Sequence, residues 1–141
     1  MAADSVFLDS NGWIAVLNED DCLHKMAVNR WPEMFRIRRE ILLTDWVIAE
    51  TGNGLARTPQ RRQFPEALRR LGRSPRVRII SVAPDLIERA LKLYEERPDK
   101  EWGLVDCASF VVMSDEGIVE AFTTDRHFEQ AGFSCLLPAA A

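Results

Sequence analysis

The feature that most constrains the fold of this chain is the alternation of short apolar segments with longer segments of helical spacing. The apolar segments are rich in Val, Ile, Leu and Phe and cover 5–9, 40–44, 76–82, 118–124 and 133–137. Short runs of this composition predict buried strands. Strands separated by helices form a mostly parallel sheet with helices on both faces. The sequence therefore predicts a three-layer α/β/α domain with a mostly parallel central sheet of about four or five strands.

The segments between and after these strands predict helices. They cover 10–21, 22–36, 45–56, 58–72, 84–96, 102–113 and 125–132. Side-chain oxygens at the start of a helix accept hydrogen bonds from its first free N–H groups. We therefore expect Ser10 or Asn11 to cap the first helix, and Thr44 or Asp45 to cap the third.

Two of these helical segments contain residues that disrupt helices. Pro32 should interrupt the segment 22–36, because proline disfavours helical backbone in the residue before it. The segment 58–72 should be broken by Pro65 and should end at Gly72, a common C-terminal signal. We therefore expect irregular helices in these two places.

Length and composition bound the class of protein. A chain of 141 residues suits one domain, which we expect to span 1–141. No apolar run approaches the roughly 20 residues that a membrane span needs. The N-terminus, MAADSVFLDS, lacks the basic region and apolar core of a signal peptide. These observations favour a cytoplasmic protein that makes no contact with a membrane.

Cysteines and histidines are too few and too scattered for a zinc or disulfide framework. Cys22, Cys107 and Cys135 are odd in number and form no CxxC pair. His24 and His127 are too far apart to form a zinc motif. The chain also has no GxxxxGK[ST] loop, which disfavours nucleotide hydrolysis of that type. A receiver-like phosphoryl-transfer domain is disfavoured because no lysine follows a late strand.

Positive charge is concentrated in one segment although the net charge of the chain is −4. The segment 57–78 holds eight arginines and one acid, which gives it a charge of +7 and leaves −11 for the remainder. Arginine suits bidentate binding of phosphates. The same residues also suit a docking surface for a protein partner. The RNA-binding candidates are Arg57, Arg61, Arg62, Arg69, Arg70 and Arg73.

Isolated acids stand in otherwise uncharged surroundings at strand ends or within predicted helices. In the segments 5–18, 46–56 and 102–113, one acid is the only charged residue, and another follows the apolar strand 118–124. Isolating a carboxylate in apolar surroundings costs several kcal/mol unless it is paired, hydrogen-bonded or bound to a metal. The topology predicts that these acids meet at one edge of the sheet. They are Asp9, Glu50, Asp106 and Asp125.

Each acid also has a simpler explanation. Asp9 and Asp125 suit helix N-caps after a strand, Glu50 suits pairing with an arginine, and Asp106 suits a cap or a buried water. No lysine or histidine lies in their segments to neutralise them. Four carboxylates at close quarters repel one another, and a hard divalent cation relieves that repulsion.

An all-oxygen set of ligands favours Mg²⁺ or Mn²⁺ over zinc. Such an ion activates a water for attack on a phosphodiester and stabilises the charge that develops. Neighbouring polar residues are candidates to orient the acids or to contact substrate. Gly52 and Gly54, costly in a helix, indicate close approach of another helix or of substrate backbone, and core packing is the favoured explanation. The orienting or substrate-contacting candidates are Ser10, Asn11, Asn53 and Thr124.

The pattern resembles the PIN-domain ribonucleases, and most closely the VapC-type toxins of toxin–antitoxin pairs. The segments FLDSNGWIAVL, LLTDWVIAETGNGL, WGLVDCASFVVM and AFTTDRHFEQAGF are similar, in that order, to the family's four acidic motifs. They carry Asp9, Glu50, Asp106 and Asp125, and the similarity covers nearly the whole chain. One departure is Val105, which stands before the third acid where many relatives have serine or threonine.

The resemblance implies a Mg²⁺- or Mn²⁺-dependent endoribonuclease, the toxin of a toxin–antitoxin pair. Asp9, Asp106 and Asp125 would bind the metal, and Glu50 would bind it directly or through water. The resemblance also implies a homodimer, a cognate antitoxin as inhibitor and a helical hairpin near 22–40 that forms a partner groove. Asp99 is either a surface aspartate or an extra acid. The alternative is a PIN-like module that binds RNA or protein without cleaving.

Overall fold

The central sheet is parallel throughout and has five strands. A computed structural model describes residues 5–36 and 39–137. The strands occupy the order β3-β2-β1-β4-β5, and every neighbouring pair is parallel. Their bounds are β1 Val6–Leu8, β2 Ile41–Thr44, β3 Val77–Ile80, β4 Glu120–Phe122 and β5 Ser134–Cys135. The predicted three-layer α/β/α fold with a parallel sheet is confirmed.

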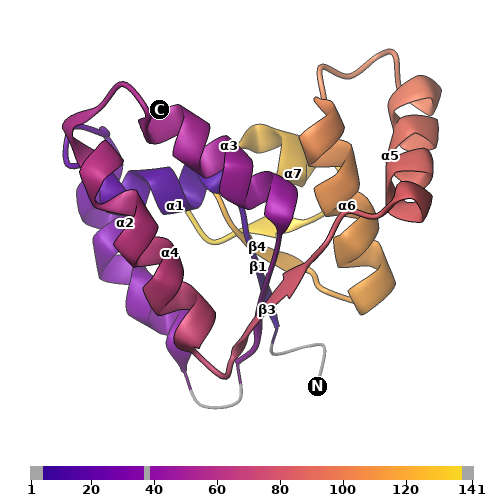
Figure 1. The fold of residues 1–141 in the computed structure, drawn as a ribbon. Coiled ribbons are helices and arrows are strands. Elements are labelled where there is room, and N and C mark those ends of the chain that lie inside the picture. Colours follow the sequence, from indigo (N-terminus) through magenta and orange to yellow (C-terminus); the bar gives the residue numbers. More distant parts are fainter. Residues whose placement is uncertain (1–4, 37–38, 138–141) are drawn as a thin grey trace.

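Helices cover both faces of the sheet (Figure 1). The chain steps outward from β1 to β2 and β3, then returns to the other side of β1 for β4 and β5. Right-handed crossovers place the helices of these two halves on opposite faces. The first half contains α1 Ser10–Leu17, α2 His24–Arg30, the 3₁₀ helix η2 Trp31–Phe35, α3 Asp45–Leu55, the 3₁₀ helix η3 Pro59–Arg62 and α4 Phe64–Arg73. The second half contains α5 Pro84–Glu96, α6 Leu104–Glu116 and α7 Arg126–Gln130.

The strand order reverses at β1, and this reversal positions the site. The connection from β1 leads to β2 on one side, whereas β4 pairs with β1 on the other. A crevice forms in such sheets beyond the carboxyl ends of the strands that flank the reversal. Residues that follow β1 and β4 therefore face a common space, together with the ends of helices from both layers.

Prolines begin helical segments in this fold. Pro32 lies in the first turn of η2, so the predicted interruption of the segment 22–36 is confirmed. The predicted break of the segment 58–72 is confirmed as well, since this segment divides at Gln63 into η3 and α4. Pro65 lies in the first turn of α4, where its missing N–H removes no helical hydrogen bond. The predicted end at Gly72 is one residue early, since the helix continues to Arg73. The helix that ends on a left-handed glycine is α6, at Gly117 with φ 68°.

One of the predicted N-caps is confirmed and the other is wrong. The Thr44 hydroxyl accepts a hydrogen bond from the backbone N–H of Val47 at 3.1 Å and caps α3. Helix α1 begins at Ser10, so Asp9 occupies the cap position instead of Ser10 or Asn11. The Asp9 side chain makes no capping hydrogen bond there. That carboxylate is turned away from the helix and toward the end of β4.

Helix α1 packs directly on the end of β4. A Cβ atom on Gly12 would lie 2.2 Å from the Phe122 carbonyl oxygen, so only glycine permits this approach. The Asp9 backbone N–H donates to the same oxygen at 3.3 Å. Trp13, on the same helix, is 1% exposed within the main core. This packing fixes the start of α1 beside the residues that follow β4.

The two glycines of α3 also permit close packing, as predicted. A Cβ atom on Gly54 would lie 2.6 Å from the side chain of Ile14 in α1, and one on Gly52 would lie 3.0 Å from the Phe64 ring. Small residues therefore bring α3, with Glu50, against α1.

Within the described residues, no helix is both long enough and apolar enough to cross a membrane.

Candidate active site

All four isolated acids line one cleft of about 320 Å³ at the reversal of the strand order. Its other lining residues come from α1, α3 and α7. The complete lining is Asp9, Ser10, Asn11, Ile14, Glu50, Gly54, Asp106, Asp125 and His127. The structure therefore brings together acids that lie up to 116 positions apart in the chain.

Local structure explains how each acid reaches the cleft. Asp9 directly follows β1, and Asp125 follows β4 and caps α7 by accepting from the His127 backbone N–H at 2.9 Å. Glu50 lies in the second turn of α3. Asp106 lies in the first turn of α6, where its Oδ2 accepts from the Gly103 backbone N–H at 3.1 Å. The proposed capping roles of Asp106 and Asp125 are thus real, and both side chains still face the cleft.

Asp9 is the most deeply buried acid of the cleft, with 1% of its surface exposed. The Thr123 hydroxyl donates to its Oδ2 at 2.7 Å. The Asp9 Oδ1 atom is buried and has no hydrogen-bond partner among the described residues. Burial, with a smaller contribution from the negative charges of Asp106, Glu50 and Asp125, raises the pKa of Asp9 to about 7. A buried carboxylate oxygen without a partner is costly unless a ligand satisfies it.

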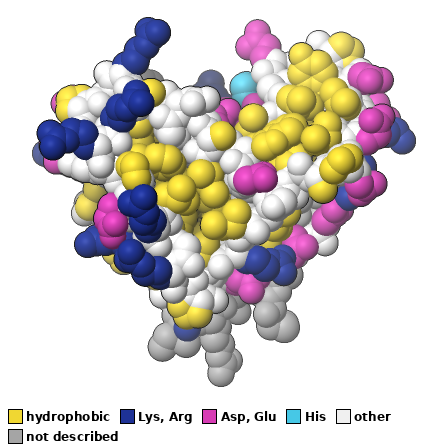
Figure 2. Space-filling view, viewed as in Figure 1, with side chains coloured by type: hydrophobic (Ala, Val, Ile, Leu, Met, Phe, Trp, Pro, Cys, Tyr) yellow, Lys and Arg dark blue, Asp and Glu magenta, His cyan; other side chains and the backbone are white. Residues whose placement is uncertain are grey.

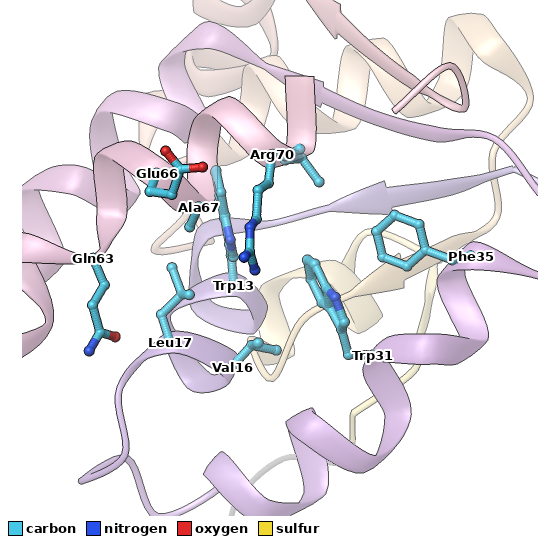
Figure 3. A pocket seen from close by; sticks show the side chains of 10 residues that line it. Trp13, Val16, Leu17, Trp31, Phe35, Gln63, Glu66, Ala67 and Arg70 are labelled. Atoms are coloured by element: carbon cyan, nitrogen blue, oxygen red, sulfur yellow. The ribbon is translucent and has the colours of Figure 1, made fainter. Parts of the chain in front are cut away.

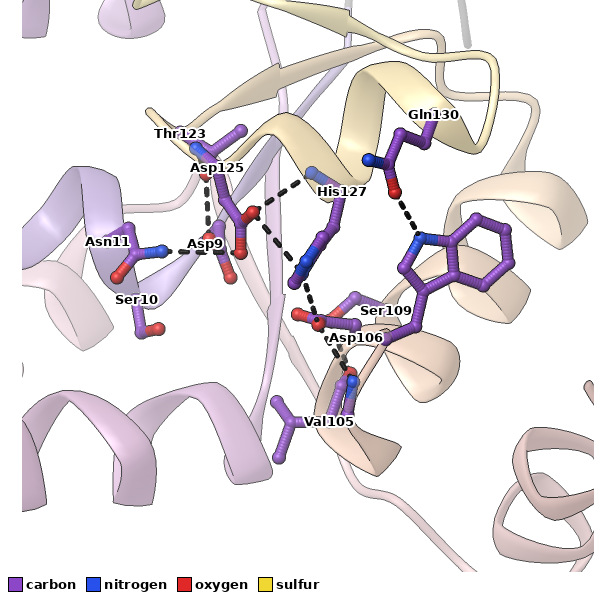
Figure 4. Close-up of polar contacts among 12 residues, drawn as sticks. Asp9, Ser10, Asn11, Val105, Asp106, Ser109, Thr123, Asp125, His127 and Gln130 are labelled. Atoms are coloured by element: carbon purple, nitrogen blue, oxygen red, sulfur yellow. Dashed lines mark hydrogen bonds and ion pairs between the residues drawn. The ribbon is translucent and has the colours of Figure 1, made fainter. Parts of the chain in front are cut away.

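Thr123, rather than the predicted Thr124, connects two of the acids (Figure 4). Its hydroxyl donates to Asp9 and accepts from the Asp125 backbone N–H at 3.0 Å. Thr123 is fully buried, and Thr124 is not among the residues that line the cleft in the described part of the chain. The sequence pair TT left this choice open because adjacent residues of an extended segment point to opposite sides.

Glu50 is held by the hydroxyl of Ser10, which donates to its Oε1. Partial burial raises the pKa of Glu50, and the charges of Asp106 and Asp125 add to this effect. Asn53, the predicted neighbour one turn later, is exposed and lies outside the lining of the cleft in the described residues. The residue that contacts Glu50 therefore comes from α1 rather than from its own helix.

His127 is the residue that the sequence analysis missed. Its Nδ1 lies 3.1 Å from Asp106 Oδ2 and 3.3 Å from Asp125 Oδ1 (Figure 4). Burial is the main cause that raises the pKa of Asp106, and hydrogen bonds from Gly103 and His127 oppose it. The sequence signal was the position of this histidine two residues after an acid, although its contact with Asp106 spans 21 positions.

Two other predicted residues have clear positions. Asn11 lines the cleft, and its side-chain amide lies 3.4 Å from Asp125 Oδ2. Asp99 is an exposed residue paired with Arg97, which lowers the pKa of Asp99 to about 2. It is not part of the lining of the cleft in the described residues. Asp99 is therefore the surface aspartate of the two alternatives.

The residues of the cleft suit a divalent cation. Ligand atoms of Asp106, Asp125 and His127 all lie within 4.8 Å of one another. The unpartnered Asp9 Oδ1 belongs to the same cleft. Carboxylates attract a hard cation, and its charge relieves their mutual repulsion. The described residues of the lining include no lysine or arginine that supplies this charge.

Arginines gather on one side of the molecule. The six candidates of the segment 57–73 are all exposed, and Figure 2 shows Lys and Arg side chains over the side that carries α4. Acidic side chains gather on the opposite side, over α5 (Figure 2). Arg76 and Arg78 are instead tied into the fold, by the Arg36 carbonyl and by Glu116 respectively. None of the six lines the cleft within the described part of the chain.

An apolar groove of about 510 Å³ lies between α1, η2 and α4 (Figure 3). The apolar side chains of α1 and η2 form its floor, while α4 supplies the apolar Ala67 and Leu71 together with the charged Glu66 and Arg70. Trp31 packs against Phe35 with ring centroids 5.3 Å apart. We call this surface the apolar groove; it is lined by Trp13, Val16, Leu17, Trp31, Phe35, Gln63, Glu66, Ala67, Arg70 and Leu71.

Comparisons with known proteins agree with this geometry. Residues 6–134 match the family model of the PIN domain. The chain is 32% identical over 129 residues to the 23S rRNA-specific endonuclease VapC20 of Mycobacterium tuberculosis, covering 91% of this chain and 95% of that protein. The crystal structure of VapC20 from that organism, described as a sarcin–ricin loop cleaving toxin, superposes with a TM-score of 0.83 at 29% identity and covers 94% of this chain and 99% of that one.

Two more distant structures share the fold alone. VapBC2 from Rickettsia felis, solved with a DNA fragment from its promoter, has a TM-score of 0.67 at 16% identity and covers 93% of this chain and 96% of that one. FitAcB from Neisseria gonorrhoeae has a TM-score of 0.64 at 18% identity and covers 92% of this chain and 95% of that one.

Proposed function

The chain belongs to the PIN-domain family and to its VapC-type branch, and from this premise we propose that it is a metal-dependent endoribonuclease. It hydrolyses RNA phosphodiester bonds and acts as the toxin of a toxin–antitoxin pair. The observation that carries the metal dependence is the buried, unpartnered Oδ1 of Asp9 in a cleft lined by three further carboxylates. Such an arrangement is unfavourable by itself and becomes favourable when a cation is bound.

Asp9, Asp106 and Asp125 would hold the ion, Mg²⁺ or Mn²⁺, with Glu50 binding directly or through water. When bound, the ion activates a water and stabilises the negative charge that develops on the phosphoryl oxygens. Thr123 and Asn11 orient Asp9 and Asp125 by hydrogen bonds to their carboxylates. These contacts lower the freedom of the two side chains and thereby favour one arrangement of the site.

Glu50 is the candidate general base. Its raised pKa brings a carboxylate closer to the range in which it accepts a proton efficiently. The Ser10 hydroxyl holds one of its oxygens, Oε1, and leaves Oε2 to take a proton from the attacking water. Ser10 and Glu50 come from different helices, so this step depends on the close packing of α1 and α3.

We propose a structured RNA as substrate. VapC20, at 32% identity, is named for cleavage of 23S rRNA, and we extend ribosomal RNA to this chain as the first substrate to test. The exposed arginines of the segment 57–73 follow Glu50 in the chain and supply positive charge on the side of the molecule that carries α4. Phosphate contacts by arginine position an RNA without reading its bases.

The apolar groove is the proposed site for a cognate antitoxin. The hairpin expected near 22–40 contributes Trp31 and Phe35 to this groove, and α1 contributes Trp13, Val16 and Leu17. Large apolar surfaces of this kind mark sites for protein partners. A homodimer, a cytoplasmic location and a single nuclease domain over 1–141 remain part of the same proposal.

The alternative, a PIN-like module that binds without cleaving, is less favoured. Such a module gains nothing from four carboxylates around one cleft, since their repulsion destabilises the fold. The deep burial of Asp9 increases this cost. A catalytic role for the cleft accounts for the retention of all four.

The decisive experiment replaces Asp106 by Asn and measures both cleavage of ribosomal RNA and metal binding by calorimetry. We expect cleavage to fall by about a thousandfold or more, since one charged ligand is lost. Asp115→Asn is the matched control, because Asp115 lies on the same helix but pairs with Arg89 at the surface. Full cleavage by the Asp106 variant, or by the wild type in EDTA, would contradict the proposal.

A further inference from the structure

His127 is the nitrogen ligand candidate in a cleft that is otherwise lined by oxygen ligands. Its position is fixed from two sides. The His127 backbone N–H donates to Asp125 Oδ1 at 2.9 Å, and the ring lies between α6 and α7 with 27% of the side chain exposed. The ring therefore sits beside both carboxylates without reaching across open solvent.

The distances from the imidazole nitrogen to the two carboxylates suit ligands that share one octahedral ion. His127 Nδ1 lies 3.1 Å from Asp106 Oδ2 and 3.3 Å from Asp125 Oδ1. Two ligands at right angles, each about 2.1 Å from an ion, lie about 3 Å apart. The distances from Nδ1 to both carboxylate oxygens are close to that value.

A second, independent observation points to a ligand in the same cleft. Asp9 Oδ1 is buried and has no hydrogen-bond partner among the described residues. An acidic cluster whose oxygens were all satisfied by neighbouring groups would leave an ion little to gain. Here one buried oxygen in the lining of the same cleft is left unsatisfied among the described residues, so an ion bound in the cleft has something to gain there.

We propose that His127 is a metal ligand and that it makes this site prefer first-row transition ions such as Mn²⁺ over Mg²⁺. The inference rests on the proposed metal-dependent function. Imidazole nitrogen is a softer donor than carboxylate oxygen and binds first-row transition ions, whereas Mg²⁺ strongly prefers oxygen ligands and retains its waters. Replacing one oxygen position by a nitrogen therefore weakens Mg²⁺ relative to Mn²⁺.

The competing role for His127 is that of a positioning residue. In that role a proton on Nδ1 would be donated to Asp106 or Asp125, and the ring would hold these carboxylates without touching the ion. Asparagine separates the two roles. Its side-chain amide is a donor near the position of Nδ1, and its oxygen is a hard ligand, but it has no imidazole nitrogen.

The experiment titrates the full-length protein with MnCl₂ and with MgCl₂ by calorimetry, for the wild type, His127→Asn and His127→Ala. We expect both variants to bind Mn²⁺ about tenfold or more weakly, while His127→Asn binds Mg²⁺ within about threefold of the wild type. Electron spin echo spectra of bound Mn²⁺ should show nitrogen couplings that disappear in both variants. The chain has two histidines, so His24→Asn is the matched control and should keep these couplings.

Three results would overturn the inference. If His127→Asn keeps wild-type affinity for Mn²⁺ and the wild type lacks nitrogen couplings, His127 is a positioning donor. If neither variant changes Mn²⁺ binding, His127 has no role toward the ion and the proposed metal-dependent function still stands. If the wild type binds neither ion, the proposed function fails together with the inference.

Discussion

The two sides of helix α1 differ in what they lack. One side carries Ser10 and Asn11 into the acidic cleft, where negative charges lack a counter-charge. The other side carries Val16 and Leu17 into the apolar groove, where apolar surface lacks a cover. A bound cation neutralises the charge of the acids, and another chain covers the exposed apolar surface. One short helix therefore links the proposed metal site to the proposed partner site.

This comparison also explains why one helix can serve both sites. Gly12 lets α1 lie against the end of β4, which fixes the polar residues of its first turn beside Asp9. Trp13 then anchors the helix in the core and forms part of the floor of the apolar groove. A partner in the groove would thus contact the helix whose first turn holds Glu50 and Asp125 through Ser10 and Asn11.

The largest expected effect concerns the acids of the cleft, which have no counter-charge in its described lining. The folded-state pKa of Asp9 is raised from 3.8 to about 7, so its neutral form is favoured in the fold. The stability associated with this proton is fully present below about pH 4 and is lost as the pH rises through about 7. Without metal, Asp9→Asn should therefore be more stable than the wild type at pH 8, by up to about 4 kcal/mol for a shift of this size.

Urea unfolding in EDTA across pH 4 to pH 8 measures this difference. Asp115→Asn serves as the control, because Asp115 is exposed and its pKa is lowered by Arg89. Addition of Mn²⁺ should reverse the order of stability, since only the wild type keeps all its ligands. If the free energy of unfolding depends on pH in the same way for the wild type and for Asp9→Asn, the raised pKa assigned to the buried Asp9 is contradicted.

The second prediction concerns the apolar groove. Leu17→Glu places a charge on its floor and should weaken the complex with the proposed antitoxin by about a hundredfold, a loss of about 3 kcal/mol. Cleavage of RNA by the free variant should remain at the wild-type level. Surface plasmon resonance with the co-purified partner measures the affinity. Val119→Glu is the control, since this valine is 59% exposed and lies outside the groove.

An equal loss of affinity in Leu17→Glu and Val119→Glu would assign the partner to a different surface. A loss of cleavage in Leu17→Glu alone would show that α1 transmits the change to Ser10 and Asn11. In that case the two sides of the helix are coupled rather than independent.

The smallest effect is expected from the exposed arginines of the segment 57–73. Replacing Arg57 and Arg62 by Gln should weaken RNA binding by about tenfold. It should also reduce the magnitude of the slope of log K against log salt concentration by about 1 to 2, as expected when one or two phosphate contacts are lost. Filter binding at several salt concentrations measures this slope. Arg89→Gln is the control because Arg89 pairs with Asp115 on the acidic side of the molecule. An unchanged slope in the Arg57 and Arg62 variant would assign these arginines to a protein partner.

Local patterns in the sequence were sufficient for the framework of the site. The five strands and the acids beside them follow from short apolar runs and from charges that stand alone. Parallel strands place their carboxyl ends at one edge, so residues such as Asp9 and Asp125 had to be neighbours. The glycines of α3 similarly indicated close packing before any contact was known, because their cost requires a compensating gain.

Contacts across the fold were beyond the sequence. Thr123 is preferred over Thr124 because the register Leu8 with Phe122 turns that side chain toward Asp9. His127 reaches Asp106 because α7 packs beside the start of α6. The prolines show the same limit, since Pro32 and Pro65 each predict an interruption and only the structure shows that each lies in the first turn of the next helix.

By itself, the sequence determined which residues become strands, which acids stand alone and that these acids gather at one edge of the sheet, because these depend on patterns over a few neighbouring residues. The tertiary structure alone decided which hydroxyl holds Asp9, which helix holds Glu50 and where an imidazole joins the acids. These choices depend on the register of β1 with β4 and on the packing of helices on the sheet. Differences of a few ångströms in that packing decide whether a hydrogen bond forms, and such differences leave no periodic signal in the chain.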